Sequence, residues 1–158
     1  MNPTAAAAPA ALDALHHWAP MVWLRASAYA YPTLETLHII GIALVFGTIC
    51  VVDLAILGWL PVNDARQVAR RLLPWTLGGF LLAAASGLTM FSTHAGDLIA
   101  NPAFVLKMLL LFVAGTNAAA LHSRGAIDVT SRTTRLQAGL SFLIWLAVIA
   151  CGVTIAYG

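Results

Sequence analysis

Charge is what this sequence has least of. Only 9% of its 158 residues are charged and 61% are hydrophobic, whereas ordinary soluble domains carry about 25% charged residues. The formal net charge of +2 is too small, and too concentrated in two short segments, for a nucleic-acid-binding surface. We therefore expect an integral membrane protein with little room for a soluble domain, and we exclude nucleic acid as a partner.

Several sequence motifs are missing as well. The chain has no glycine-rich phosphate-binding loop and no serine-hydrolase nucleophile elbow. It has no CxxC or CxxCH, so covalent attachment of a c-type haem has no support. The two cysteines, Cys50 and Cys151, fall at different expected membrane depths, whereas a disulfide needs Cα atoms within about 7 Å. We expect both to be free thiols.

Four apolar segments dominate the chain. About 20 apolar residues in a helix match the thickness of a bilayer core. The predicted spans are residues 33–60, 74–93, 103–122 and 136–156. The expected fold is all-α, an integral membrane four-helix bundle over residues 32–158.

The N-terminal region differs from these spans. Residues 1–12 are mostly alanine and proline without a basic start, so we expect a retained, flexible tail rather than a cleaved signal peptide. In residues 13–31 aromatic side chains recur, which is typical of the headgroup level of a membrane. We expect an interfacial amphipathic helix there; its aromatic residues are Trp18, Trp23, Tyr29 and Tyr31.

Arginine gathers in the connections between spans one and two and between spans three and four. Each connection carries three arginines and one aspartate, a net charge of +2. Short basic loops stay in the cytoplasm. We therefore expect a multi-pass protein of a bacterial inner membrane with both termini in the periplasm.

Three ionisable residues interrupt the first span: Glu35, His38 and Asp53. Each costs on the order of 2.5–3.5 kcal/mol near a membrane centre, so such residues are functional candidates. At 100° per residue, His38 shares a stripe with the apolar residues Val45, Ile49, Val52 and Ile56. This stripe should face the protein interior, which makes His38 the leading candidate for a site.

The second span carries a stripe of mostly small residues: Thr76, Gly79, Ala83, Gly87 and Met90, followed by His94. Small residues let transmembrane helices approach closely. The same stripe would alternatively leave room for a flat macrocycle such as haem b. His38 would then be one axial ligand and His94 or Met90 the other. Lys107 and Arg25 would balance the charge of the propionates.

Copper is the competing occupant, because imidazole and thioether groups also suit copper. In that case the outward histidines and the methionine would converge on one face: His16, His17, His38, His94 and Met90.

Each polar residue also has a purely structural alternative. His38 could be a core histidine hydrogen-bonded to Glu35 or to a hydroxyl, and Lys107 could pair with Glu35 or extend to the interface. Asp53 would pair with a loop arginine or with His122. Among the structural polar residues of the spans we count Glu35, Asp53, Asn117 and His122.

The first span, ETLHIIGIALVFGTICVVDLAILG, followed by a third span with an early lysine, resembles a family of uncharacterised bacterial four-helix membrane proteins grouped near the copper-resistance CopD domain. It is also similar, more distantly, to the HemJ-like membrane protoporphyrinogen oxidases. The HemJ likeness implies haem b as cofactor, with His38 and Lys107 matching the histidine and lysine that those proteins need. The CopD likeness implies copper handling at the outer face.

Three functional hypotheses follow. The first is a haem b protein that moves electrons between a quinone or small oxidant and a periplasmic partner, with oxidoreductase activity left open. The second is copper binding or transport. The third is an accessory subunit of a larger membrane complex. Besides the lipid bilayer, the expected partners are a quinone or periplasmic redox protein, and either further copies of the chain or other subunits.

Overall fold

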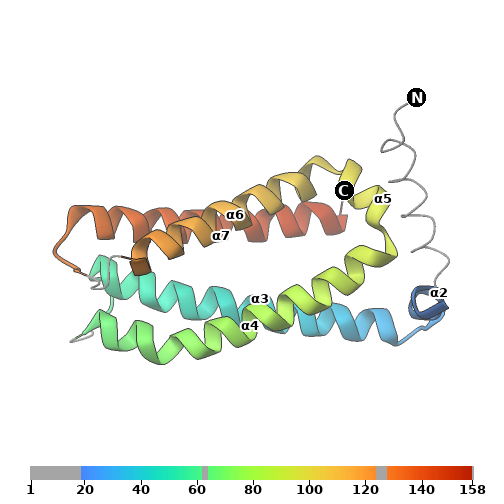
Figure 1. Ribbon diagram of the computed structural model, residues 1–158, viewed down its shortest axis with the longest axis horizontal. Helices are drawn as coiled ribbons and strands as arrows, with labels where there is room; N and C mark the ends of the chain where they lie inside the picture. Colours follow the sequence, from blue (N-terminus) through green and yellow to red (C-terminus); the bar gives the residue numbers. More distant parts are fainter. Residues whose placement is uncertain (1–18, 62–63, 124–127, 158) are drawn as a thin grey trace.

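The computed structural model describes residues 19–61, 64–123 and 128–157 (Figure 1). All regular secondary structure in these ranges is helical, which confirms the all-α fold. The helices are α2 (Ala19–Ala26), α3 (Ala30–Leu57), α4 (Ala65–Thr93), α5 (Ala95–Ala100), α6 (Pro102–Ser123) and α7 (Arg132–Tyr157).

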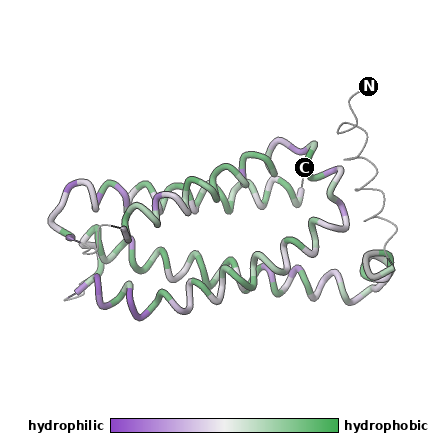
Figure 2. The backbone as a smooth tube through the Cα atoms, in the orientation of Figure 1, coloured by the Kyte–Doolittle hydropathy of each residue, from purple (hydrophilic) through white to green (hydrophobic). Residues whose placement is uncertain are grey.

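Four of these helices, α3, α4, α6 and α7, are long and apolar enough to cross a membrane. Large apolar side chains cover their outer faces; Phe112 is 75% exposed and Leu81 67%. Hydrophobic residues line the long helices along most of their length (Figure 2). Such surfaces are stable against lipid tails rather than water, so the chain is a multi-pass membrane protein.

The four long helices form two pairs, α3 with α4 and α6 with α7 (Figure 1). The pairs are joined mainly through α3 and α7, whereas α4 and α6 barely touch. At one end the pairs meet in a small apolar core made of Ala55, Ile56, Ala65, Leu121 and Ala138. We call this the arginine end, because five arginines lie there near the beginnings of α4 and α7: Arg66, Arg70, Arg71, Arg132 and Arg135. The opposite end is the α5 end.

Three boundaries of the first two spans differ from those expected, the first being the start of α3 at Ala30 rather than at residue 33. α3 ends at Leu57 rather than at residue 60, because Gly58 adopts a left-handed conformation (φ 80°) and its N–H bonds back to Ala55. α4 begins at Ala65 rather than at residue 74, because the Asp64 carboxylate accepts the Arg66 N–H at 2.9 Å. Pro74 stands inside α4 without ending it, as membrane helices tolerate.

The connections show further differences. The connection expected between spans two and three contains the short helix α5, and Asn101 caps α6 by accepting the Ala103 N–H at 2.9 Å. Before α7, the Thr130 hydroxyl and backbone N–H bond to the Asp128 carboxylate and lower its pKa. Of the expected interfacial segment, α2 is seen nearly end-on in Figure 1, so it runs across the bundle axis; residues 1–18 lie outside the described ranges.

Candidate functional site

The small-residue stripe of α4 is used for close packing against α3. A Cβ added at Gly41 would stand 2.7 Å from the Ala83 nitrogen and 2.9 Å from the Gly79 oxygen. One added at Gly79 would stand 3.0 Å from Leu44 Cβ. The two backbones therefore touch, as small residues permit in membranes. This contact fills the surface that we had considered as room for a macrocycle, so a macrocycle has no place between α3 and α4 at this level.

His38 lies in the same interface, one step toward the α5 end. Its Nδ1 is 2.8 Å from the Ala83 carbonyl oxygen and 3.2 Å from Ser86 Oγ. The imidazole ring covers Gly87, where an added Cβ would stand 2.8 Å from Cε1. The histidine ring is thus fixed by one carbonyl group and by the absence of a side chain at Gly87.

This geometry selects the protonation state of the ring. Because a carbonyl oxygen can only accept, Nδ1 carries the proton in the neutral imidazole and Nε2 keeps its lone pair. Nε2 has no hydrogen-bond partner among the described residues and is not fully buried. His38 therefore presents a fixed electron-pair donor, the arrangement that metal-binding histidines commonly show.

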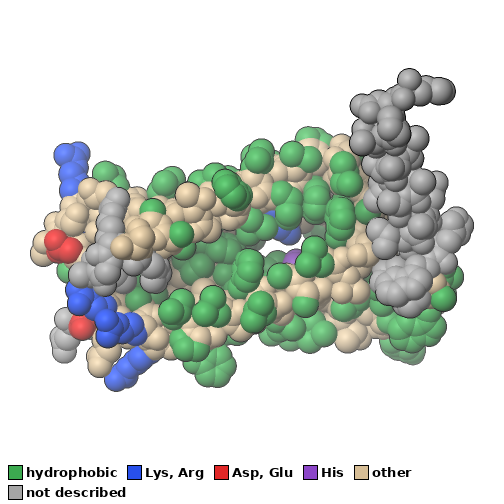
Figure 3. All heavy atoms as spheres, in the orientation of Figure 1, with side chains coloured by type: hydrophobic (Ala, Val, Ile, Leu, Met, Phe, Trp, Pro, Cys, Tyr) green, Lys and Arg blue, Asp and Glu red, His purple; other side chains and the backbone are tan. Residues whose placement is uncertain are grey.

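Lys107 approaches from the other helix pair. Its Nζ packs over Gly152 of α7, where an added Cβ would stand 3.7 Å away, and its charge acts on His38. The expected ion pair with Glu35 is not formed, and the Glu35 side chain is exposed. Figure 3 shows a basic side chain and a histidine at the rim of an opening between the pairs.

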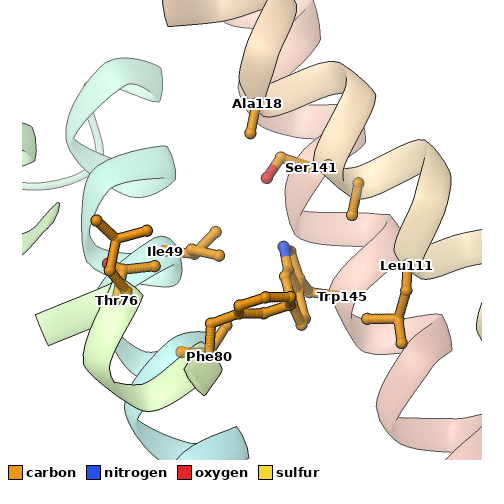
Figure 4. Close-up of a pocket in the computed structure, with 11 residues that line it drawn as sticks. Ile49, Thr76, Phe80, Leu111, Ala118, Ser141 and Trp145 are labelled. Atoms are coloured by element: carbon orange, nitrogen blue, oxygen red, sulfur yellow. The ribbon is translucent and has the colours of Figure 1, made fainter. Parts of the chain in front are cut away.

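A cavity of about 280 Å³ lies between the two pairs, nearer the arginine end than His38. Its walls come from all four long helices: Val45, Ile49, Thr76, Leu77, Phe80, Leu111, Ala114, Gly115, Ala118, Ser141 and Trp145. Most of these side chains are apolar. In Figure 4 the Ser141 oxygen and the Trp145 ring nitrogen point into the cavity from α7, opposite Ile49, Thr76 and Phe80.

Asp53 lies behind this cavity. It is only 3% exposed, and its Oδ2 has no hydrogen-bond partner in the described part of the chain. Its carboxyl lies close to the Ser141 side chain. Arg135 donates to the Leu57 carbonyl at 3.2 Å and not to Asp53. The expected pairing with an arginine is therefore wrong for the described arginines, and the His122 side chain lies outside the described part.

The structure does not bring His94 to His38. His94 joins α4 to α5, is exposed, and packs edge-on against Tyr31 with ring centroids 6.0 Å apart. It lies seven residues beyond Gly87, which corresponds to about 10 Å along a helix. Two axial ligands must reach one metal ion, so this pair is not assembled. Met90 is nearer, one turn beyond Ser86.

The remaining candidate residues either do not line the cavity or lie outside the described part of the chain. The Asn117 amide donates to the Gln137 carbonyl at 3.1 Å and so links α6 to α7. Both cysteines are free, as expected. The side chain of Arg25, like His16 and His17, lies outside the described part of the chain.

Sequence reasoning missed Ser141 and Trp145. The available signal was their spacing: two hydrogen-bonding side chains four residues apart share one face of an otherwise apolar span. No protein family, curated protein or solved structure was found to match this chain.

Proposed function

We propose that this chain is a bacterial inner-membrane protein that binds haem b through His38 and transfers electrons. The observation that carries the proposal is the hydrogen bond from His38 Nδ1 to the Ala83 carbonyl. That bond leaves the Nε2 lone pair available on a part-buried ring held between two membrane-spanning helices. Histidine is a common axial ligand of haem, and cofactors in helix bundles are held by side chains on facing helices.

The surrounding residues fit this cofactor. The Lys107 ammonium, on the facing helix pair, has the charge that complements the carboxylates of the haem propionates. When bound, haem b supplies one-electron redox chemistry. Met90 stands on α4, the helix against which the His38 ring already packs, so the proposal assigns no second ligand.

The copper hypothesis receives less support. Among the described residues, no three His, Cys, Asp or Glu side chains lie together in a group able to hold a metal ion. The copper hypothesis therefore depends on His16 and His17, which belong to residues 1–18 outside the described ranges. It makes a distinct prediction, stoichiometric copper in the purified protein, and so remains the alternative outcome of the experiment below.

The test is the visible spectrum of detergent-purified protein, oxidised and dithionite-reduced. Wild type from haem-replete cells should show Soret and reduced α bands, and His38→Ala should lose them because the axial ligand is gone. His94→Ala is the matched control and should keep both bands. A colourless wild type would overturn the haem proposal, and elemental analysis for copper would then decide between copper handling and an accessory role.

The orientation is part of the proposal. The five arginines of α4 and α7 gather at one end of the bundle (Figure 3), which favours the arginine end in the cytoplasm and the α5 end in the periplasm. Alkaline phosphatase fused to the C-terminus should then be active. An inactive phosphatase together with a fluorescent GFP fusion at the same position would reverse the orientation.

A further inference from the structure

The cavity between the helix pairs has one polar wall. Ser141 and Trp145 stand one helical turn apart on α7, and their hydroxyl oxygen and ring nitrogen point into the space (Figure 4). The Trp145 ring nitrogen has no hydrogen-bond partner among the described residues and is not fully buried there. It is therefore an N–H donor directed at whatever fills the cavity.

The opposite wall offers no comparable donor. The Thr76 hydroxyl bonds to Thr48 Oγ1 at 2.8 Å, and Thr48 in turn donates to the Leu44 carbonyl at 2.8 Å. The other groups lining the cavity from α3 and α4 are apolar, including the aromatic ring of Phe80. A ligand that fits would be a flat apolar body with a hydrogen-bond acceptor at the edge that faces α7.

Ser141 has a second property, which is the chemistry of its hydroxyl group. A hydroxyl both donates one hydrogen bond and accepts others. The Ser141 oxygen, which points into the cavity, can therefore donate to a carbonyl and accept from a hydroxyl. It suits a ligand that exists both as a carbonyl and as a hydroxyl.

The cavity also has a route to the bilayer. Leu77 and Phe80 of α4 and Leu111 and Gly115 of α6 line it, yet α4 and α6 barely touch. The space between these helices therefore opens sideways, toward lipid. A ligand with a long apolar tail can place its ring inside while the tail stays among the lipid chains.

We propose that this cavity binds the ring of a membrane quinone, with Ser141 and Trp145 donating hydrogen bonds to a quinone carbonyl. A quinone is flat and apolar, carries carbonyl acceptors that become hydroxyls in the quinol, and has an apolar tail. The inference rests on the proposed function in that it names the class of electron partner. The ring site itself does not include His38, which is absent from the cavity walls.

The test measures binding to the full-length protein in lipid nanodiscs by equilibrium dialysis, with empty nanodiscs as the baseline. The probes are menadione and 2-methylnaphthalene, which share a ring system and differ by the two carbonyl groups. Menadione should bind at least about tenfold more tightly, because only it can accept the two hydrogen bonds. Equal affinities for the two probes would mean that the cavity is an unselective apolar site that accepts any lipid chain. Absence of binding by either probe would mean that other protein segments or a second copy of the chain fill the cavity. Either result overturns the proposal.

The variants assign the effect to α7. Ser141→Ala and Trp145→Phe should each weaken menadione binding about fivefold to tenfold and leave 2-methylnaphthalene binding unchanged. Thr154→Ala and Trp75→Phe are the matched controls, since Thr154 bonds to its own helix and Trp75 is exposed on the outer face of α4. Control variants that weaken binding as strongly would contradict the assignment.

One further variant separates this inference from the haem proposal. His38→Ala should lose the haem bands and keep menadione binding, because the two sites use different residues. Haem bands in wild type without selective menadione binding would overturn the quinone site alone. Selective menadione binding by a colourless wild type would overturn the haem proposal alone.

Discussion

α4 packs closely against α3 but leaves a cavity between itself and α6. Toward α3, glycines and an alanine let the backbones touch, with an added Cβ at Gly41 only 2.7 Å from the Ala83 nitrogen. Toward α6, α4 presents the large residues Leu77 and Phe80, and a cavity remains. Lipid tails are as apolar as leucine, so in a membrane close fit rather than hydrophobicity holds helices together. The small residues on one face of α4 therefore decide where the bundle is closely packed. The large residues on another face decide where a cavity remains.

Trp145 takes part in both a packed region and the open one. It packs against the apolar cluster of Ala114, Ile144 and Val148 in the α6–α7 pair and at the same time lines the cavity. Its ring therefore stands in the wall between the α6–α7 pair and the open space. Polar groups gather along this open space, with His38 and Lys107 on one side of the cavity and Asp53 behind it.

The strongest way to break the closed contact is Gly41→Ala. The new methyl group would meet the backbone of α4, which cannot move aside as a side chain does, and such overpacking costs about 1–3 kcal/mol. Unfolding by titration with SDS should show this loss. Gly47→Ala, on the same helix with nothing within 4 Å of its added Cβ, should lose nothing; equal losses would show that the α3–α4 contact is not the cause.

Gly87→Ala tests the link between this contact and the proposed haem ligand. The added methyl would stand 2.8 Å from His38 Cε1 and displace the ring, and changes to groups that orient a metal ligand typically cost 10–100-fold in affinity. Haem titration should therefore show affinity lowered about tenfold or more. Gly78→Ala, whose added Cβ meets nothing within 4 Å, should keep wild-type affinity, and an unchanged Gly87→Ala would argue against His38 as the ligand.

Filling the open region should separate binding from stability. Gly115 lines the cavity and its added Cβ meets nothing within 4 Å, so Gly115→Leu has room to occupy the proposed ring site. Menadione binding should fall at least about tenfold, with unfolding in SDS unchanged within about 0.5 kcal/mol. Gly139→Leu, also in open space, should affect neither. Full menadione binding by Gly115→Leu would place the quinone elsewhere.

The smallest expected effect concerns the second helix pair. Asn117→Ala removes the bond from its amide to the Gln137 carbonyl between α6 and α7, and a net loss of about 1 kcal/mol is typical for one hydrogen bond. Thr116→Ala is the control, because its hydroxyl bonds only to Phe112 in its own helix. The same unfolding assay measures both; an equal loss in Thr116→Ala would remove the special role of Asn117.

Much of the fold followed from the sequence because length and hydrophobicity are properties of one segment at a time. The spans and the all-α class needed no knowledge of neighbours, and α6 at Pro102–Ser123 lies within a residue of its predicted bounds. The predicted start of the second span was wrong because the helix is capped by Asp64 and begins at Ala65. Pro74 does not break the helix, since membrane-spanning helices tolerate proline. His38 and Lys107 were chosen as site candidates because ionisable residues are rare in spans.

The rest of the site depends on how the helices are rotated and which of them touch. A stripe such as Gly79, Ala83 and Gly87 predicts either a close helix contact or space for a ligand, and only the packed bundle shows that α3 occupies it. Ser141 and Trp145 carry no charge, and their spacing of four residues, the one signal in their segment, does not say whether the shared face meets protein or lipid. By itself the sequence determined that four helices are long and apolar enough to cross a membrane and which ionisable groups they carry. The tertiary structure decided that His94 stays away from His38 and that α7 directs two donors into a shared cavity, because membrane helices choose their neighbours by shape.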